Sequence, residues 1–274
     1  MGKKLISVVT RVMEFLEPMR IRIHSAYTSF FLVLSVFPLL VLLFGLLGYT
    51  SLGLEEVLEL ISAFVPAAFE PMVGKIISGA YENTSAMVLS ISVVTALWSA
   101  SRSVLGVMEG LNAVYDVKEN RHYLITRTIS VAYTFLFLLV ILLTLVLHVF
   151  GHAIMDFLRM TTDPILLFLM ELIDVRYVFL LVLQTVVFSL MYAFLPSRNN
   201  RLVESIPGAV VATLGWTVFS DLFSLYVEFY PNYANIFGSV YAAALAMLWL
   251  YICVKIMFYG AALNRWLREW KSKE

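Results

Sequence analysis

Long stretches without a Lys, Arg, Asp or Glu residue limit what this chain can fold into. A membrane-spanning helix needs about 20 mainly apolar residues. Six intervals between ionised residues reach or nearly reach that length: Ser25–Leu54, Asn83–Ser101, Thr128–Met155, Tyr177–Ser197, Ser205–Ser220 and Phe229–Val254. The fifth interval is the shortest, and we expect its helix to continue past Asp221 to Tyr226. The spacing therefore predicts six transmembrane helices.

The overall composition supports a membrane protein. The chain is 61% hydrophobic and 14% charged, whereas soluble domains are about 45–50% apolar and about 25% charged. Because one water-soluble core cannot enclose that excess, we expect the bilayer to be the solvent. The single Cys253 excludes an internal disulfide framework. We predict an all-α integral membrane protein with a six-helix domain over residues 25–266, an N-terminal segment at 1–24 and a tail at 267–274.

Basic residues alternate between the connections and indicate an orientation. The N-terminal segment, the second and fourth connections and the C-terminal tail hold most of the 19 Lys and Arg residues. By the positive-inside rule, both termini are predicted to be cytoplasmic in a multi-pass protein of the cytoplasmic (inner) membrane. The first outer connection is acidic, and its apolar residues from Leu54 to Val65 follow helical spacing. We expect amphipathic helices there, lying over the outer mouth of the bundle.

The second interval continues into charged sequence without a helix break. On a helical wheel, Trp98, Arg102, Glu109, Asn112 and Asp116 share one face, and apolar side chains occupy the opposite half. This pattern predicts a cytoplasmic extension of the second span. Its polar face either meets water or lines the mouth of a cavity. In a cavity, Arg102 would bind the phosphate or carboxylate of an amphiphile.

Three other candidate positions lie within the predicted spans. Lys255 either lines a cavity or extends its side chain toward the cytoplasmic interface. Asp221 lies near the outer end of the fifth helix, in a vestibule or at the interface. Ser35 precedes Pro38 by one turn, where a kink would free backbone carbonyls.

One group of residues has a spacing typical of metal ligands. His148, His152 and Asp156 follow each other at four-residue intervals, so they share one face of a helix. No further carboxylate or cysteine is predicted beside them. The group is therefore a weak candidate, and we favour histidines that contact water or a neighbouring helix.

Short motifs that occur in a fixed order carry a resemblance to a known family. They are "FFLVLSVFPLL" with Ser35 and Pro38, Trp98-Ser99-Ala100-Ser101-Arg102 followed by Asn112 and Tyr115, "IPGAVVATLGW" with Trp216, and Gly260-Ala261 with Asn264. In this order the motifs resemble those of the YihY/BrkB family of integral membrane proteins, once labelled ribonuclease BN. The chain departs from the family at Ala262, where a glutamate is frequent, so no role of that glutamate is transferred. The resemblance implies a six-helix inner-membrane fold and a lipid-related transport role.

The leading functional prediction is a transporter or flippase-like protein for a lipid or another anionic amphiphile. The route is expected to be a polar cavity among the helices. The predicted substrate-binding residues are Ser35, Trp98, Arg102, Glu109, Asn112, Tyr115, Trp216, Asp221, Lys255 and Asn264. Membrane lipids are the expected partners, association with further copies of the chain stays open, and neither nucleic acid nor a cofactor is expected.

Three alternatives belong to other functional classes. The chain is a channel or small-solute carrier, or a non-transporting scaffold for envelope assembly, or, least favoured, a membrane-embedded hydrolase or ribonuclease. A nuclease needs metal-binding or acid–base groups where RNA can reach them. The sequence predicts no such catalytic residues. A phosphate-binding GxxxxGK[ST] motif does not occur either, so transport is expected to be passive or driven by an ion gradient.

Overall fold

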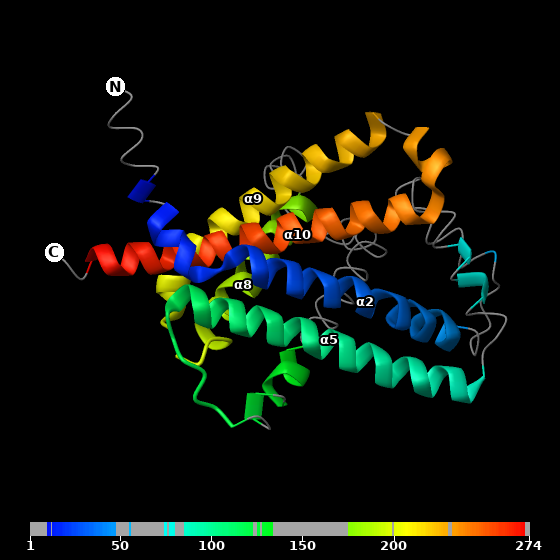
Figure 1. The fold of residues 1–274 in the computed structure, drawn as a ribbon, viewed down its shortest axis with the longest axis horizontal. Helices are drawn as coiled ribbons and strands as arrows, with labels where there is room; N and C mark the ends of the chain where they lie inside the picture. The colour runs from blue at the N-terminus through cyan, green and yellow to red at the C-terminus, as the bar shows by residue number, and fades with distance from the viewer. Residues whose placement is uncertain are drawn as a thin grey trace, which may run out of the picture.

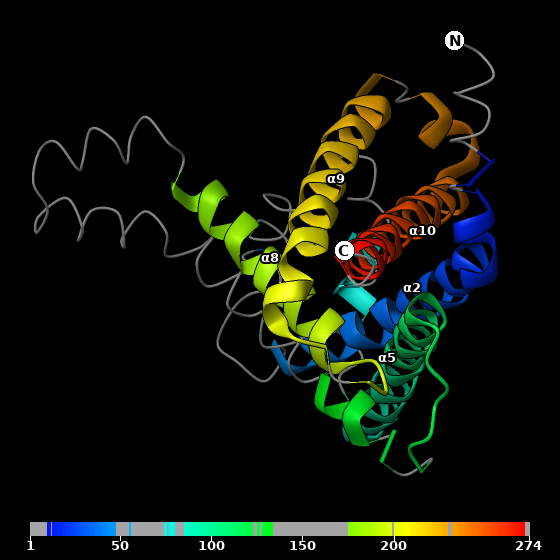
Figure 2. The same ribbon diagram turned by 90° about the vertical axis from the view of Figure 1, so that its left-hand side faces the viewer.

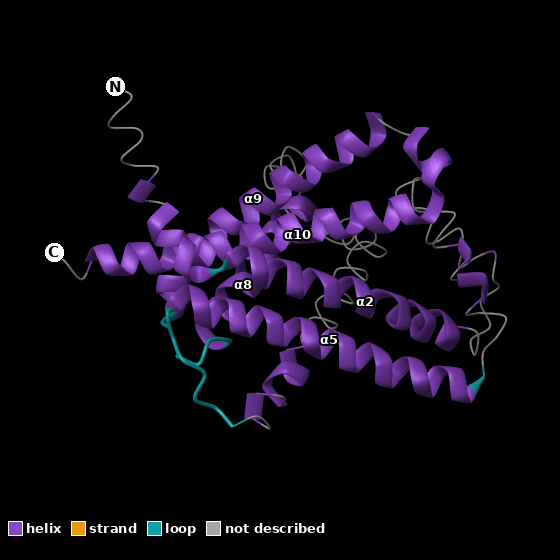
Figure 3. Cartoon of the chain, in the orientation of Figure 1, coloured by secondary structure: helices purple, strands orange, loops and turns teal. Residues whose placement is uncertain are grey.

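The computed structural model describes residues 10–11, 13–47, 55, 74–75, 77–79, 85–122, 125–126, 128–133, 175–198, 200–229 and 232–271. Within these ranges every regular element is a helix (Figure 3). The elements are the 3-10 helix η1 (Glu17–Met19) and the α-helices α2 (Ile21–Leu47), α5 (Ala86–Tyr115), α8 (Val175–Phe194), α9 (Leu202–Phe229) and α10 (Asn232–Lys271). The predicted all-α class is confirmed.

Among the described residues, three helical segments are long and apolar enough to cross a membrane: Met87–Tyr115, Leu202–Val227 and Ala243–Lys271. Val178–Phe194 is a shorter apolar helix. Together they establish an all-α membrane protein, whereas the count of six spans, the domain boundaries and the orientation stay predictions. The expected third span lies outside the described residues beyond residue 133, and so does most of the expected amphipathic segment in the first outer connection.

The helices form a bundle around α2, α5 and α10. Helices α2 and α5 lie side by side, α10 packs against α9, α2 and α5, and α8 packs against α9 (Figures 1 and 2). Helices α5, α8 and α10 end, and α9 begins, at the same end of the bundle as the C-terminus (Figure 1). We call this end the basic end, after Arg121, Arg198, Arg201, Arg265 and Arg268.

Helix α5 continues through Arg102, as the absence of a helix break predicts. The Ser85 side chain caps its start by accepting a hydrogen bond from Val88 N at 3.2 Å. Its end is set by Asp116, which has a left-handed backbone with φ 55° and follows the last helical residue, Tyr115. The helix therefore includes 30 residues and spans about 45 Å.

Small side chains allow α2 and α5 to approach closely. Gly106 faces Tyr27 and Thr28, where an added Cβ would lie 2.6 Å from the tyrosine ring. Ser103 donates a hydrogen bond from Oγ to the Thr28 carbonyl at 3.3 Å across the same interface. Small residues and interhelical hydrogen bonds are typical of helix pairs that associate in a bilayer.

Candidate functional site

Three of the predicted site residues, Asn112, Tyr115 and Asn264, lie at the basic end. All three residues are buried, with only 5–6% of their surface exposed. Asn112 and Tyr115 belong to the last turn of α5, and Asn264 belongs to the last third of α10. Packing of α10 against α5 thus joins residues that are far apart in the sequence.

Asn112 connects two chain segments. Its Nδ2 donates to Glu119 Oε2 at 2.9 Å and to Ser197 Oγ at 3.2 Å, and its Oδ1 accepts from Ser197 N at 2.8 Å. Arg121 reinforces this connection by donating to the Glu119 carboxylate at 2.9 Å and to the Leu195 carbonyl at 2.9 Å. Because each amide and carboxylate here has a partner within the protein, this network is structural.

Asn264 joins α9 to α10. Its Oδ1 accepts a hydrogen bond from Gly208 N at 2.7 Å, and its Nδ2 donates to the Ser205 carbonyl at 3.0 Å. Pro207 interrupts the hydrogen-bond ladder of α9 at this level. A side chain from α10 therefore binds the α9 backbone beside the proline.

Arg265 closes the end of α5. Its Nη1 donates to the Val114 carbonyl at 2.9 Å, and its Nε forms an ion pair with Glu269 at 2.7 Å. The last carbonyls of a helix have no partner within the helix and attract positive charge. Arg265 thus satisfies one of these carbonyls and fixes α5 against α10.

A small polar pocket lies beside this network. Its lining residues are Tyr115, Asn200, Glu204, Ser205, Asn264 and Arg268, and it has room for about one water-sized atom, about 10 Å³. The Arg268 guanidinium lies 5.6 Å from the centre of the Tyr115 ring and donates to Asn200 Oδ1 at 2.9 Å. The Tyr115 hydroxyl is buried. Its oxygen interacts with the Asn264 amide, but its hydrogen has no acceptor in the part of the chain that the structure describes.

Arg102 lies apart from the basic end, on a face of α5 that we call the outer stripe. The stripe consists of Met87, Ile91, Val94, Trp98, Arg102 and Glu109. All of these except the partly buried Arg102 are exposed.

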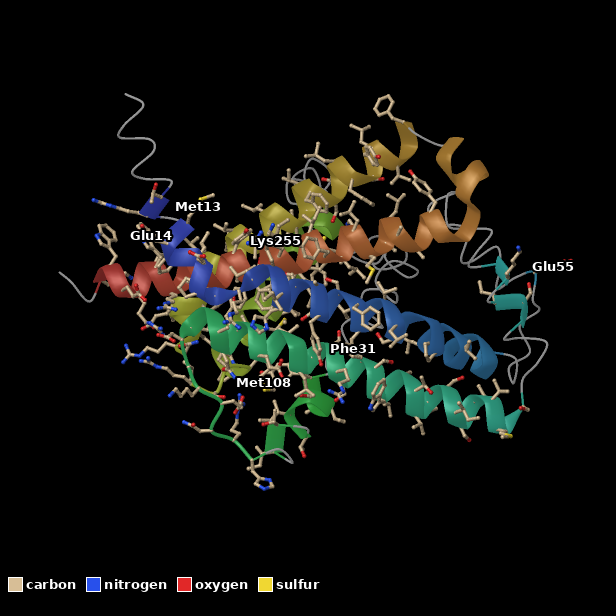
Figure 4. The ribbon with its side chains drawn as sticks, in the orientation of Figure 1. Met13, Glu14, Phe31, Glu55, Met108 and Lys255 are labelled. Atoms are coloured by element: carbon tan, nitrogen blue, oxygen red, sulfur yellow. The ribbon has the colours of Figure 1, made fainter. Side chains whose placement is uncertain are left out.

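An aromatic side chain is the neighbour of Arg102. The Arg102 guanidinium lies 5.5 Å from the Trp98 ring centre, and Trp98 contacts Phe31 of α2 edge-on at 6.1 Å (Phe31 is labelled in Figure 4). Arg102 Nε is buried and has no hydrogen-bond partner among the described residues, and none of their carboxylates pairs with Arg102.

Comparison with known proteins establishes the family. The family model described as virulence factor BrkB matches residues 17–274. The chain belongs to the BrkB family. The predicted resemblance is therefore confirmed.

Relatives within this family are named as membrane proteins or as ribonuclease-like. The chain is 34% identical over 251 residues to the ribonuclease-like protein YfkH of Bacillus subtilis (strain 168), covering 90% of each chain. It is 23% identical over 266 residues to a UPF0761 membrane protein of Vibrio vulnificus (strain YJ016), covering 93% of this chain and 81% of the relative. No solved structure matches the chain significantly.

The remaining predicted site residues of this BrkB-family chain lie at separate places. Ser35 is buried and donates to the Leu32 carbonyl of its own helix at 2.7 Å. Trp216 packs between Phe188 and Trp249, and Asp221 is exposed on α9. None of the three contributes to the polar pocket or to the outer stripe.

Lys255 is partly buried in the middle of α10 (Lys255 is labelled in Figure 4). Its Nζ is 5.7 Å from the Tyr251 ring centre and 5.8 Å from that of Tyr259. The same face carries the exposed Leu248 and Trp266. Whether Lys255 lines a cavity or extends toward the interface therefore stays a prediction, because its Nζ lies about equally far from one aromatic ring on each side along the helix.

The predicted common polar face of α5 is only partly correct. Trp98, Arg102 and Glu109 share the outer stripe, but Asn112 is buried beneath residues 195–198. Asp116 follows the end of the helix and caps it. A helical wheel places residues by angle alone, whereas the segment that covers Asn112 comes from another part of the chain.

The predicted metal ligands cannot be compared with the structure, because His148, His152 and Asp156 lie outside the described residues. Within the described ranges, no three His, Cys, Asp or Glu residues are grouped so that they could hold a metal ion.

Four residues of the basic end were not predicted from the sequence: Glu119, Ser197, Asn200 and Arg268. The only signal there was the excess of basic residues in these connections.

Hydrogen bonding in the Asn112 network predicts a pH effect on stability. Burial by itself would raise the pKa of the Glu119 carboxyl, but hydrogen bonds from Arg121 and Ser197 and the Arg121 charge outweigh it and lower the pKa to about 2. The lowered pKa stabilises the folded state above the ordinary value of 4.5, and this stabilisation is lost as the pH falls toward 2.

We therefore expect Glu119→Gln to lower the Tm at neutral pH, with the difference from the native protein shrinking through this acidic range. Thermal unfolding of both proteins in detergent at several pH values measures this difference in Tm. The exposed Lys118→Gln variant is the control, and it should show no such convergence. A constant difference between native protein and Glu119→Gln at all pH values would contradict the assignment.

Proposed function

We propose that this membrane protein moves a lipid or another anionic amphiphile across the cytoplasmic membrane, with Arg102 binding its phosphate or carboxylate group. The observation that carries the proposal is Arg102, a partly buried cation in a membrane-length helix that has no acidic partner among the described residues. Ionisable side chains within membrane spans are costly, and they frequently mark the path of a substrate.

Arg102 lies well inside the helix. It precedes Tyr115, the last residue of α5, by about 20 Å of helix. An arginine at the centre of a membrane helix costs about 3 kcal/mol. The contact with Trp98 offsets part of this cost. The buried Nε still needs an acceptor, and an anionic headgroup supplies both an acceptor and a negative charge.

The outer stripe suits an amphiphile on both sides of Arg102. Met87, Ile91 and Val94 are more than half exposed and form an apolar track on which an acyl chain can lie. Toward the basic end, the exposed Glu109 would repel an anionic headgroup. A headgroup would therefore be held at Arg102, with its chains directed along the apolar track. Because the side chains of the stripe on either side of Arg102 are exposed, we propose this surface rather than an enclosed cavity as the route.

Proteoliposomes test the proposal directly. Vesicles containing the purified protein receive fluorescently labelled phosphatidylglycerol or phosphatidylcholine, and an impermeant reductant bleaches the label in the outer leaflet. We expect the native protein to move phosphatidylglycerol and Arg102→Ala to be at least about tenfold slower, since one charge-assisted hydrogen bond contributes about that factor. The exposed Arg22→Ala on α2 removes the same charge away from the stripe and should retain the native rate.

Two results of this experiment would overturn the proposal. One is the absence of lipid movement in native vesicles, and the other is an Arg102→Ala rate equal to the native rate. Release of a trapped small solute without lipid movement would favour the channel or small-solute carrier instead. Retention of both lipid and solute would favour the scaffold.

We also propose that the basic end faces the cytoplasm, as the positive-inside rule predicts. Trp270 is exposed near the end of α10. In a Cys253→Ser background, Trp270→Cys should react with an impermeant maleimide in broken cells but not in intact cells. Labelling of intact cells would reverse the orientation.

A further inference from the structure

The small pocket at the basic end combines hydrogen-bond donors that lack partners. Tyr115 is 5% exposed, and the hydrogen of its buried hydroxyl has no acceptor in the described ranges. A buried hydroxyl without a partner is unfavourable unless a ligand or a water satisfies it. Arg268 and Asn264 line the same pocket.

Positive charge at the pocket is not neutralised by an ion pair. Arg268 forms one hydrogen bond, to the neutral side chain of Asn200, and no described carboxylate lies within 4.0 Å of its nitrogens. Asn264 uses its amide for the Ser205 carbonyl and for the Tyr115 oxygen, so it contributes no free donor of its own and orients the tyrosine hydroxyl instead. The Tyr115 O–H and the Arg268 guanidinium are therefore two donors, one of them charged, around one space.

From this arrangement we propose that the pocket binds an oxyanion, a phosphate or carboxylate group that inserts one oxygen between the Tyr115 hydroxyl and the Arg268 guanidinium. The space accommodates about one water-sized atom, so the rest of the anion would remain at the mouth. Charge-assisted hydrogen bonds from a guanidinium to such oxygens are among the strongest in proteins.

Glu204 supplies an internal check on this proposal. It lines the same pocket and is exposed, so its carboxylate opposes a bound anion. If the pocket binds an oxyanion, Glu204→Gln should strengthen binding, whereas loss of a merely structural residue would not.

This site is separate from Arg102, because it lies at the basic end, at the last turn of α5, rather than on the outer stripe. The proposal therefore does not depend on lipid movement, and its test requires none. The phosphate could belong to a lipid headgroup or be free in solution, and two arms of the experiment distinguish these sources.

The experiment measures the Tm of the full chain against ligand concentration. One arm titrates inorganic phosphate onto protein in detergent at constant ionic strength, with chloride as the reference salt. The other arm compares nanodiscs that contain phosphatidylglycerol with nanodiscs that contain only phosphatidylcholine. The variants are Tyr115→Phe, Arg268→Gln and Glu204→Gln, and the control is Arg201→Gln, an exposed arginine at the same end that does not line the pocket.

We expect a saturable rise in Tm with half-saturation at least about tenfold weaker in Tyr115→Phe and in Arg268→Gln, because each removes a hydrogen bond to a charged group. Glu204→Gln should lower the half-saturation concentration, and Arg201→Gln should match the native protein. A response to phosphate identifies a soluble anion, and a response to phosphatidylglycerol alone identifies a lipid headgroup. The proposal is overturned if neither ligand acts, or if Tyr115→Phe and Arg268→Gln respond as the native protein does.

Discussion

Gly260→Ala is expected to lower the free energy of unfolding by about 3 kcal/mol, because α9 and α10 touch there backbone to backbone. A Cβ on Gly260 would lie 2.5 Å from the Gly208 carbonyl oxygen and 2.8 Å from the Tyr192 hydroxyl. Neither neighbour has room to move. The tyrosine is fully buried and donates to the Met257 carbonyl at 2.6 Å, and the carbonyl belongs to a helix. Unfolding of the detergent-solubilised protein by added sodium dodecyl sulfate measures the loss.

Other glycines of the chain provide a graded control series. Gly208→Ala should be as damaging as Gly260→Ala, since its Cβ would overlap the Gly260 carbonyl and lie 2.6 Å from Asn264. Gly215→Ala should cost less, because its Cβ would meet only the Ile256 side chain, at 3.0 Å. Gly74 has no described atom within 4 Å of an added Cβ, and its alanine variant should be neutral. Equal stability of all four variants would show that α9 and α10 are not in close contact.

Asn264→Leu is expected to cost about 2 kcal/mol, although leucine has a similar size. The substitution leaves the buried Gly208 N–H without its acceptor and removes the donor to the Ser205 carbonyl. A buried polar group that loses its partner carries the full cost of its lost solvation. The same titration with sodium dodecyl sulfate measures the change.

Two further variants separate the lost hydrogen bonds from altered packing. Asn264→Asp keeps an acceptor for Gly208 N but loses the donor to Ser205, so its stability should differ from that of the leucine variant. Ser35→Ala removes a buried hydroxyl that bonds only within its own helix, and it should cost less than about 1 kcal/mol. If Asn264→Leu is as stable as the native protein, the side chain does not join α9 to α10.

Sequence reasoning was effective for features that depend on neighbouring residues. Hydropathy identified the intervals that became α8, α9 and α10, because a span needs only a continuous apolar run. The expectation that the fifth helix passes Asp221 is confirmed, since α9 continues to Phe229. The apolar half of α5 is buried as its periodicity predicts, with Met108 and Leu111 at 0–1% exposure (Met108 is labelled in Figure 4).

The candidate site was predictable only in part. The family motifs singled out Asn112, Tyr115 and Asn264, and these residues do lie at the same end of the bundle. Their partners were not predictable, because the connections that provide Ser197 and Asn200 carry no helical or apolar pattern to fix their position. The hydrogen bonds of Asn112 to Ser197 join residues 85 positions apart, a separation at which local periodicity carries no information.

The sequence by itself determined that the chain is an all-α membrane protein and that Arg102 lies within a continuous helix, because helix formation and bilayer insertion follow from local hydrophobicity and helix breaks. The tertiary structure alone decided which polar residues are satisfied and which are not. Asn112 and Asn264 are bonded by segments distant in the chain, whereas Arg102 Nε and the hydrogen of the Tyr115 hydroxyl have no acceptor among the described residues. Hydrogen bonds act over about 3 Å, so only the packing of α5, α9 and α10 determines where donors remain for a ligand.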